Sequence, residues 1–543
     1  MKRQKASWSA LGFDSGITFS VRYGFILAPV RRIGTLQVLS KLDVEFSGLY
    51  NMGNVGRPLT RVSQQYSEFT SMTRTIKDQL DPIFRPRSVA VIGASNNPER
   101  WGYGTMTCIL NWSQFRGDVY PINPKDEFVH GLKAYTSVTE VPGPIDLAVI
   151  VISADRVVDA FRQCVKKGVG GAVIITAGFA EIGREGVGLQ EQLIRLSRES
   201  GIRFVGPNCM GIWTSAARLN LCFWDIVKPG PIAFISQSGT MGDYLFEVSQ
   251  AKGYGFAKFV SSGNQASLDV CDYLEYLADD EDTRAIALYL EGVKDGKRFL
   301  QMARKATARK PVLAYKVGQT EAGSRAAASH TASLTGSAGL FDAACRQAGV
   351  QICENMMEMF DFAEALGTQP LPRGNRVGIA SGGGGFCVVT AEACAKAGLE
   401  VPVLDDETQQ AILKHVREFS PTPVNPVDLI ARKSHIDYAH AIEILAKQDY
   451  IDGLVIMPPY GGFHRTSSAD HMKQLVEGCS IIADIPKKYG KPVLAFAMRE
   501  YKNTGMYEIL KRGDIPFFES PETCARAMMS LSSYGRYRQG TGA

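Results

Sequence analysis

Short apolar runs alternate with longer helical stretches along most of this chain, and this rhythm constrains its fold more than any other feature. In residues 78–212, the helical stretches Val157–Lys167 and Gly188–Ser200 each lie between apolar runs typical of buried strands. The predicted strands are Ser88–Ile92, Asp146–Ile152, Gly171–Thr176 and Arg203–Val205. Strands that alternate with helices in this way pair in parallel, so we predict a doubly wound α/β sheet.

The same rhythm occurs twice more. Residues 225–367 contain predicted strands at Ile232–Ile235, Phe256–Val260, Ala285–Leu290 and Pro311–Lys316. Residues 372–536 contain predicted strands at Arg376–Ala380, Gly453–Met457 and Lys491–Phe496, followed by a predicted helix over Pro521–Leu531. Residues 369–374 are predicted to form a linker, because they combine two prolines with a glycine. A chain of 543 residues exceeds what one hydrophobic core usually serves, so we predict three α/β modules at these bounds.

The positive charge of the chain is concentrated before the first module. Residues 1–77 contain 11 Lys or Arg against 4 Asp or Glu, whereas the rest of the chain contains 49 against 51. A nearly neutral body argues against a broad nucleic-acid surface. The extension has no clear periodicity, so we interpret it as a disordered leader, or as a misassigned start with Met72 as the working initiator. A transit-like segment fits less well, because Asp14, Asp43 and Glu45 interrupt it.

The apolar residues and cysteines exclude further classes. No apolar run approaches the ~18 residues of a membrane-spanning helix, so we predict no membrane partner. The 11 cysteines include no CxxC pair and no Cys/His spacing suited to zinc, so no metal site is predicted. Several of them, such as Cys164, Cys271 and Cys345, lie among apolar residues, which predicts reduced core thiols in a cytoplasmic protein.

His330 lies among small and hydroxyl residues, in the stretch from Ser329 to Ser337. An imidazole can accept a phosphoryl group covalently and pass it on, provided that its neighbours leave room for in-line approach. Small neighbours provide that room, although an ordinary surface or capping histidine on a flexible loop fits the same residues. Of the other histidines, only His464, after Gly461-Gly462-Phe463, stands out.

Two glycine-rich turns follow predicted strands. The first runs from Gly93 to Gly102, and the second runs from Ser236 to Gly242 and leads into a predicted helix. Free N–H groups and the positive end of a helix dipole make such a turn a suitable phosphate-binding site. A tight strand-to-helix corner needs glycine for steric reasons as well, so each turn alone supports either interpretation. A third stretch, Ser381–Gly385, lacks the Gly-Lys-Ser/Thr ending of a Walker loop.

Taken in order, the motifs of the chain carry a family resemblance. They are Phe84–Ser95, Ile122–Lys125, Ile174–Phe179, Gly206–Gly211, Ser236–Gly239, Ser262–Gln265, Tyr289–Gly292, Ser329–Thr331 and Asn425–Leu429. From about Leu80 to about Leu531 the chain resembles the α subunit of the NDP-forming acyl-CoA synthetases, which include ADP-forming acetate–CoA ligase and share core domains with succinyl-CoA synthetase. The resemblance implies an N-terminal Rossmann-like CoA-binding domain followed by two flavodoxin-like α/β domains of the succinyl-CoA synthetase type.

The resemblance also implies roles for particular residues. His330 corresponds to the phosphorylated histidine of the family, and Glu291 corresponds to the glutamate that supports it. Donors for the phosphoryl group are expected at Ser238, Gly239 and Thr240. The expected coenzyme A contacts are Gly93, Ala94, Ser95, Asn123, Pro124, Lys125, Thr176 and Asn208. Without the resemblance, each of three residues has a plainer interpretation. Lys125 could be a solvated loop lysine, Thr176 a residue of an ordinary strand-to-helix corner, and Glu291 a solvent-facing turn residue.

The chain departs from the family pattern at two places. Ala332 and Ser333 stand where the family more often has glycine and alanine, and Arg100-Trp101 stands where a Lys-Val-like pair is usual. A methyl group at position 332 narrows the backbone options beside the histidine, so the departure bears on turnover more than on fold.

Nothing in the sequence resembles the ATP-grasp portion that supplies nucleotide and magnesium in this family. We therefore expect a hetero-oligomer in which an ATP-grasp β subunit binds Mg and ATP/ADP, or GTP/GDP. The expected reaction interconverts a small carboxylic acid, CoA and NTP with acyl-CoA, NDP and phosphate through an acyl phosphate and a phosphohistidine. Two alternatives stay open at this point: a non-catalytic CoA- or acyl-CoA-binding regulatory protein, and an NAD(P)-dependent oxidoreductase suggested by the Rossmann-like turns alone.

Overall fold

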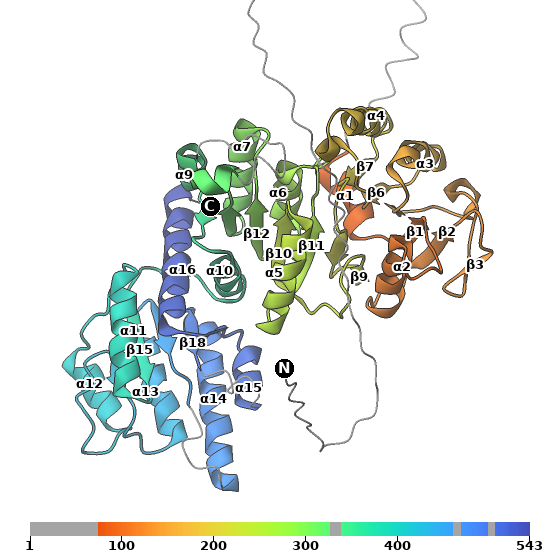
Figure 1. Ribbon diagram of the computed structural model, residues 1–543. Helices are drawn as coiled ribbons and strands as arrows, with labels where there is room; N and C mark the ends of the chain where they lie inside the picture. The colour runs from red at the N-terminus through yellow and green to blue at the C-terminus, as the bar shows by residue number, and fades with distance from the viewer. Residues whose placement is uncertain (1–73, 326–337, 460–467, 498–504, 543) are drawn as a thin grey trace, which may run out of the picture. The chain divides into compact units, whose positions relative to one another are not determined.

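A computed structural model describes residues 74–325, 338–459, 468–497 and 505–542. These residues form three large sheets covered by helices, together with a two-stranded ribbon of β3 (Phe128–Val129) and β4 (Leu132–Lys133) (Figure 1). The α/β class with largely parallel sheets is confirmed. His330, His464 and the extension up to residue 73 lie outside the described residues.

The first sheet has five parallel strands in the order β2-β1-β5-β6-β7. Its strands are β1 (Ser88–Ile92), β2 (Asp118–Ile122), β5 (Leu147–Ile150), β6 (Gly171–Ile174) and β7 (Arg203–Val205). The accompanying helices are α1 (Ile76–Phe84), α2 (Trp101–Asn111), α3 (Ala154–Lys167) and α4 (Arg184–Ser200), with a short 3-10 turn at Ala180–Ile182. Helices α3 and α4 each end at a glycine in the left-handed conformation, Gly168 and Gly201, which is a frequent way to stop a helix.

The second sheet has seven strands in the order β14-β13-β12-β10-β11-β8-β9. Its strands are β8 (Ile212–Thr214), β9 (Leu219–Asn220), β10 (Pro229–Ser236), β11 (Phe256–Ser261), β12 (Ala285–Leu290), β13 (Val312–Lys316) and β14 (Gln351–Ile352). Its helices are α5 (Gly239–Ala251), α6 (Val270–Asp279), α7 (Gly296–Thr307), α9 (Ala338–Gln347) and α10 (Met356–Thr368). Strand β8 is antiparallel to β11, and β9 is antiparallel to β8. This antiparallel edge was not predicted, because pairing with β11 creates it and no local pattern does.

The third sheet has five parallel strands in the order β16-β15-β17-β18-β19. Its strands are β15 (Val377–Ser381), β16 (Val427–Asp428), β17 (Gly453–Ile456), β18 (Val493–Phe496) and β19 (Phe517–Phe518). Its helices are α11 (Gly384–Lys396), α12 (Asp406–Leu413), α13 (His435–Lys447), α14 (Ala469–Tyr489), α15 (Gly505–Arg512) and α16 (Pro521–Thr541).

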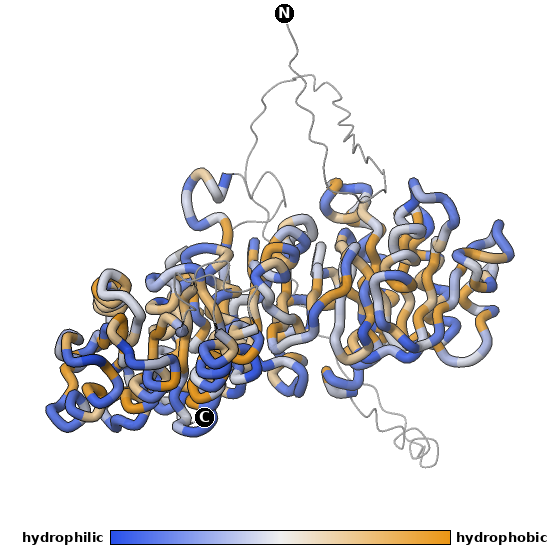
Figure 2. The backbone as a smooth tube through the Cα atoms, turned by 90° about the horizontal axis from the view of Figure 1, so that it is seen from below, coloured by the Kyte–Doolittle hydropathy of each residue, from blue (hydrophilic) through white to orange (hydrophobic). Residues whose placement is uncertain are grey.

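Side chains of successive strand residues enter different cores. In β1, Val89 and Val91 join a cluster that also contains Ala233 and Ile235 of β10, whereas Ala90 packs with Ile150 on the other face of the first sheet. This is the period-two alternation of a strand that is buried on both faces. Figure 2 shows the result along the backbone, with orange apolar strands inside and blue hydrophilic residues on the outer helices and loops.

The thiols and the helices bear on two further expectations. All 11 cysteines are buried thiols that form no disulfide with one another, which confirms the prediction of reduced core thiols. None of the helices in the described part of the chain is both long and apolar enough to cross a membrane.

Candidate active site

Every described residue that the sequence analysis assigned to a ligand lines one cavity of about 1880 Å³. The cavity lies at the carboxyl ends of strands from the first and second sheets, where open α/β sheets bind their ligands. These residues are Gly93, Ala94, Ser95, Asn123, Pro124, Lys125, Thr176, Asn208, Ser238, Gly239, Thr240 and Glu291. His330 cannot be located relative to them, because it lies outside the described residues.

Close packing fixes the first glycine turn. Gly93 has φ +98°, and a Cβ atom there would lie 2.5 Å from the Val151 carbonyl oxygen. A Cβ atom on Gly102, in the first turn of α2, would lie only 1.8 Å from the Gly93 carbonyl oxygen. Both positions therefore require glycine, and their contact holds the N-terminus of α2 against the turn. The first N–H groups of a helix have no intrahelical acceptor, so this helix start offers donors to an anion in the cavity.

Asn123 organises the loop that carries Lys125. Its side-chain amide donates to the Ala94 carbonyl at 3.0 Å, and its side-chain oxygen accepts from the backbone N–H of Lys125 at 2.8 Å. The second bond is a local turn of the kind that asparagine favours. It leaves Lys125 exposed at the rim of the cavity, on the same side as the glycine turn.

Asn264 joins the two modules across the cavity. It accepts from the Asn208 amide at 3.2 Å and donates to Glu181 and Gln190 at 2.5 and 3.0 Å. Burial raises the pKa of the Glu181 carboxyl, but hydrogen bonds from Asn264 and from backbone N–H groups outweigh burial, so the net pKa is lowered. Glu181 therefore brings a fixed negative charge to the cavity wall. The Thr176 hydroxyl instead donates to the Ile152 carbonyl at 2.7 Å, as a corner residue does.

The N-terminus of α5 forms the opposite wall. The Ser238 hydroxyl caps this helix by accepting from the Met241 N–H at 3.4 Å, and the Gly242 N–H donates to the Ser238 carbonyl at 3.0 Å. The N–H groups of Gly239 and Thr240 come before these first bonds of the helix, where helix N–H groups have no intrahelical acceptor. A Cβ atom on Gly239 would lie 2.7 Å from Met210 Cγ, so the helix start packs tightly against the chain that follows β7. The arrangement offers preorganised donors to an anion.

Gln237 holds the turn that carries Glu291. Its side-chain oxygen accepts from the backbone N–H groups of Glu291 and Gly292, and its amide donates to the Gly292 carbonyl at 2.7 Å. Glu291 directly follows β12 and lines the cavity. Three residues later, Lys294 donates to the carbonyls of Asn264 and Gln265 at 2.9 and 2.8 Å, and burial lowers the pKa of its ammonium group.

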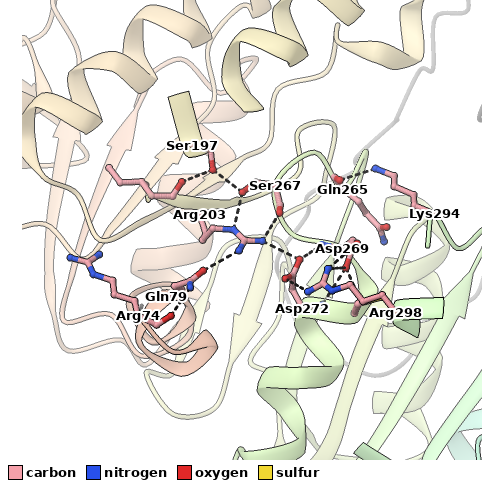
Figure 3. A network of polar contacts seen from close by, with 12 residues as sticks. Arg74, Gln79, Ser197, Arg203, Gln265, Ser267, Asp269, Asp272, Lys294 and Arg298 are labelled. Carbon is pink, nitrogen blue, oxygen red and sulfur yellow. Dashed lines mark hydrogen bonds and ion pairs between the residues drawn. The ribbon is translucent and has the colours of Figure 1, made fainter. Parts of the chain in front are cut away.

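A polar network lies at the junction of the first two modules (Figure 3). Arg203, on β7, donates to the Ser267 carbonyl at 2.6 Å, to Gln79 at 3.0 Å and to Asp272 at 3.1 Å. Asp272 also accepts from Arg298 at 2.7 Å. The network fixes the loop before α6, which includes the Asn264 and Gln265 that Lys294 contacts.

Sequence reasoning missed Glu181, Gln190, Gln237 and Lys294 as cavity residues. Gln237 stood inside a quoted motif, and Lys294 lies three residues after Glu291, so proximity was an available signal. For Glu181 and Gln190 the sequence contains no such signal, because their role arises from contact with a loop more than 70 residues away. Within the described residues, no group of three or more His, Cys, Asp or Glu side chains is arranged to hold a metal ion.

Two family models match the modules that form the cavity. Residues 87–215 match a model described as a CoA binding domain, and residues 229–366 match one described as a succinyl-CoA ligase like flavodoxin domain. The α subunit of acetate–CoA ligase [ADP-forming] II from Pyrococcus furiosus is 42% identical to this chain over 458 residues, covering 83% of this chain and 97% of that protein. The chain belongs to the ADP-forming acetate–CoA ligase family.

Two further relatives extend the similarity of this member of the ADP-forming acetate–CoA ligase family. 4-Hydroxybutyrate–CoA ligase [ADP-forming] from Nitrosopumilus maritimus is 35% identical over 83% of this chain, which spans 63% of that protein. A solved structure of the dinucleotide-forming acetyl-coenzyme A synthetase 1 of Candidatus Korarchaeum cryptofilum, in complex with phosphate and ADP, is 33% identical. The matched region covers 86% of this chain and 99% of the chain in that structure, with a TM-score of 0.75. The family resemblance and the fold class drawn from the motifs are thereby confirmed.

Proposed function

We propose that this chain is the α subunit of an NDP-forming acid–CoA ligase that works through a phosphohistidine at His330. The observation that carries the proposal is the shared cavity, which combines a CoA-type glycine turn, the N-terminus of α5 and the carboxylate of Glu291. The relatives support it, since two of them are named as α subunits of ADP-forming ligases. We further propose domains at residues 78–212, 225–367 and 372–536.

The first module binds coenzyme A in this proposal. The N-terminus of α2 and the Gly93–Ser95 turn face the diphosphate, and Lys125 supplies a positive charge at the rim. Thr176 and Asn208 stand near the thiol end. The CoA binding domain model over residues 87–215 supports this assignment.

The reaction divides one difficult transfer into separate steps. In the direction of acyl-CoA cleavage, inorganic phosphate attacks the thioester carbonyl, and the CoA thiolate leaves to give an acyl phosphate. A ring nitrogen of His330 then attacks the phosphorus, and the carboxylate leaves. The phosphohistidine finally passes its phosphoryl group to NDP and gives NTP. Each step runs in reverse for acyl-CoA synthesis.

Ser238, Gly239 and Thr240 would stabilise the phosphoryl group, because donors at a helix N-terminus need little reorganisation as charge develops. Glu291 would accept a hydrogen bond from the ring nitrogen that is not phosphorylated, which fixes the orientation of the imidazole. The Gln237 bonds to the backbone of residues 291 and 292 hold that carboxylate in position.

We propose that the nucleotide and magnesium bind to an ATP-grasp β subunit, with which this chain forms a hetero-oligomer in the cytoplasm. The α-subunit names of the relatives support a partner of some kind. The lone chain should then form no thioester from NTP, acid and CoA, and activity should appear when the β subunit is added.

The deciding experiment is phosphoryl labelling of the α/β assembly with γ-labelled NTP and magnesium. The label should appear on this chain in an acid-labile, alkali-stable form, as expected for a phosphoramidate. His330→Ala should abolish labelling and turnover while CoA still binds, and Glu291→Gln should slow labelling by ~10²-fold or more. His440→Ala, at a half-buried histidine of α13, is the matched control and should label normally. Full thioester synthesis by His330→Ala would refute the mechanism and reopen the non-catalytic CoA-binding alternative.

A further inference from the structure

Trp101 presents a large apolar ring at the rim of the cavity. It is the first residue of α2, lines the cavity and is 63% exposed. The contact between Gly102 and the Gly93 carbonyl holds its backbone beside the glycine turn. An exposed indole that borders a cavity is suited to stack on a flat ligand ring.

Cations of the first module line the same cavity. Arg100, Lys125 and Arg156 all line it, and all three belong to the first module. The three acidic side chains of the first module that line the cavity have other partners: Asp126 accepts from Asn123 at 3.1 Å, Asp159 pairs with Arg162, and Glu181 accepts from Asn264 at 2.5 Å. Arg100 caps α2 without any hydrogen bond from its side chain to the helix. A flat apolar ring flanked by cations is complementary to an adenine nucleotide that carries several phosphates.

We propose that Trp101 is the stacking platform for the adenine ring of coenzyme A, and that Arg100 binds the 3′-phosphate. This inference rests on the proposed function, and it assigns the adenosine end of the ligand to a rim whose residues depart from the usual family pair. The pantetheine arm then runs from the glycine turn toward Asn208 and the wall that carries Glu291. All of the residues that bind the adenosine end lie within residues 87–215, so the site does not depend on the second module.

Equilibrium titration of the full chain with three probes tests the assignment. The probes are CoA, dephospho-CoA, which lacks the 3′-phosphate, and 4′-phosphopantetheine, which lacks the adenosine. Adenine stacking should quench indole fluorescence in the wild-type chain, and calorimetry should give the affinities. Trp101→Ala should weaken CoA and dephospho-CoA about tenfold, the usual loss for one stacked base, and should leave 4′-phosphopantetheine unchanged. Arg100→Ala should weaken CoA and leave dephospho-CoA unchanged.

Trp224→Ala is the matched control. Trp224 is 60% exposed, and its ring lies near Gly104 of α2, the helix that begins with Trp101. Trp224 does not line the cavity. This variant should bind all three probes as the wild type does and keep the CoA-dependent quenching. Equal CoA affinity of Trp101→Ala and wild type would overturn the inference while leaving the proposed function intact. A wild-type chain that binds no CoA would overturn the proposed function itself.

Discussion

Replacing Arg203 with methionine removes the guanidinium that joins β7 to the loop before α6. The variant loses donors to Ser267, Gln79 and Asp272, and the Asp272 side chain is only 6% exposed. Leaving a buried carboxylate without a partner costs about 3–5 kcal/mol. Because Arg298 still donates to Asp272 at 2.7 Å, we expect a smaller loss of about 2–3 kcal/mol in the free energy of unfolding.

The double variant sharpens this test. Arg298→Met alone leaves Asp272 paired with Arg203, so its cost should also be moderate. Arg203→Met/Arg298→Met removes both cations, and its cost should exceed the sum of the two single costs by about 1 kcal/mol or more. Urea unfolding followed by circular dichroism measures all three variants. A double variant that is additive, or an Arg203→Met variant within about 0.5 kcal/mol of wild type, would refute the assigned role of this network.

Three further predictions follow from single features. Burial raises the pKa of the Cys164 and Cys209 thiols to about 12, so the native chain should resist thiol reagents at pH 8 and should react fully only after unfolding; rapid native labelling would contradict this. Burial, with help from Arg432 and His471, lowers the pKa of His435 to about 4. Unfolded histidine titrates near pH 6.5, so the stability that neutral His435 provides is complete above that pH and is lost as the pH falls toward 4. His435→Gln should flatten this part of a melting-temperature profile, and an unchanged slope would exclude the assignment. Gly102→Ala puts a Cβ atom 1.8 Å from the Gly93 carbonyl oxygen, so this variant should bind CoA about tenfold more weakly or worse in calorimetry. Gly104→Ala is the control: its Cβ atom meets only the Trp224 ring, at 3.3 Å, so this variant should bind CoA with normal affinity.

Several strands could be predicted from apolar runs in the sequence. Ser88–Ile92, Arg203–Val205 and Ala285–Leu290 form strands with the predicted bounds, and Pro521–Leu531 lies within a helix that extends to Thr541. The antiparallel strands β8 and β9 were missed, because pairing with β11 creates them and no local pattern does. All of their residues except Ile212 fall in the interval 213–224, which the predicted modules left unassigned.

The predicted cavity residues all stand within four positions of a strand end. Gly93, Asn123 and Glu291 directly follow β1, β2 and β12, Ser238 stands two residues after β10, and parallel pairing brings such positions to one edge of a sheet. Glu181 is different, because its importance depends on the Asn264 amide that reaches it from another module. Contacts of this kind depend on how two modules pack against each other, and no local sequence pattern predicts that packing.

Helix α16 has a consequence for how the chain unfolds. Met528 and Leu531 share one core with Phe234 of the second sheet and with Val377 and Leu494 of the third. The Tyr534 hydroxyl donates to the Thr307 carbonyl at 2.9 Å, at the end of α7. Detaching this helix would expose apolar surface on both sheets at once. The second and third sheets should therefore melt in a single cooperative transition, and amide hydrogens in β10 and β17 should exchange with the same opening free energy.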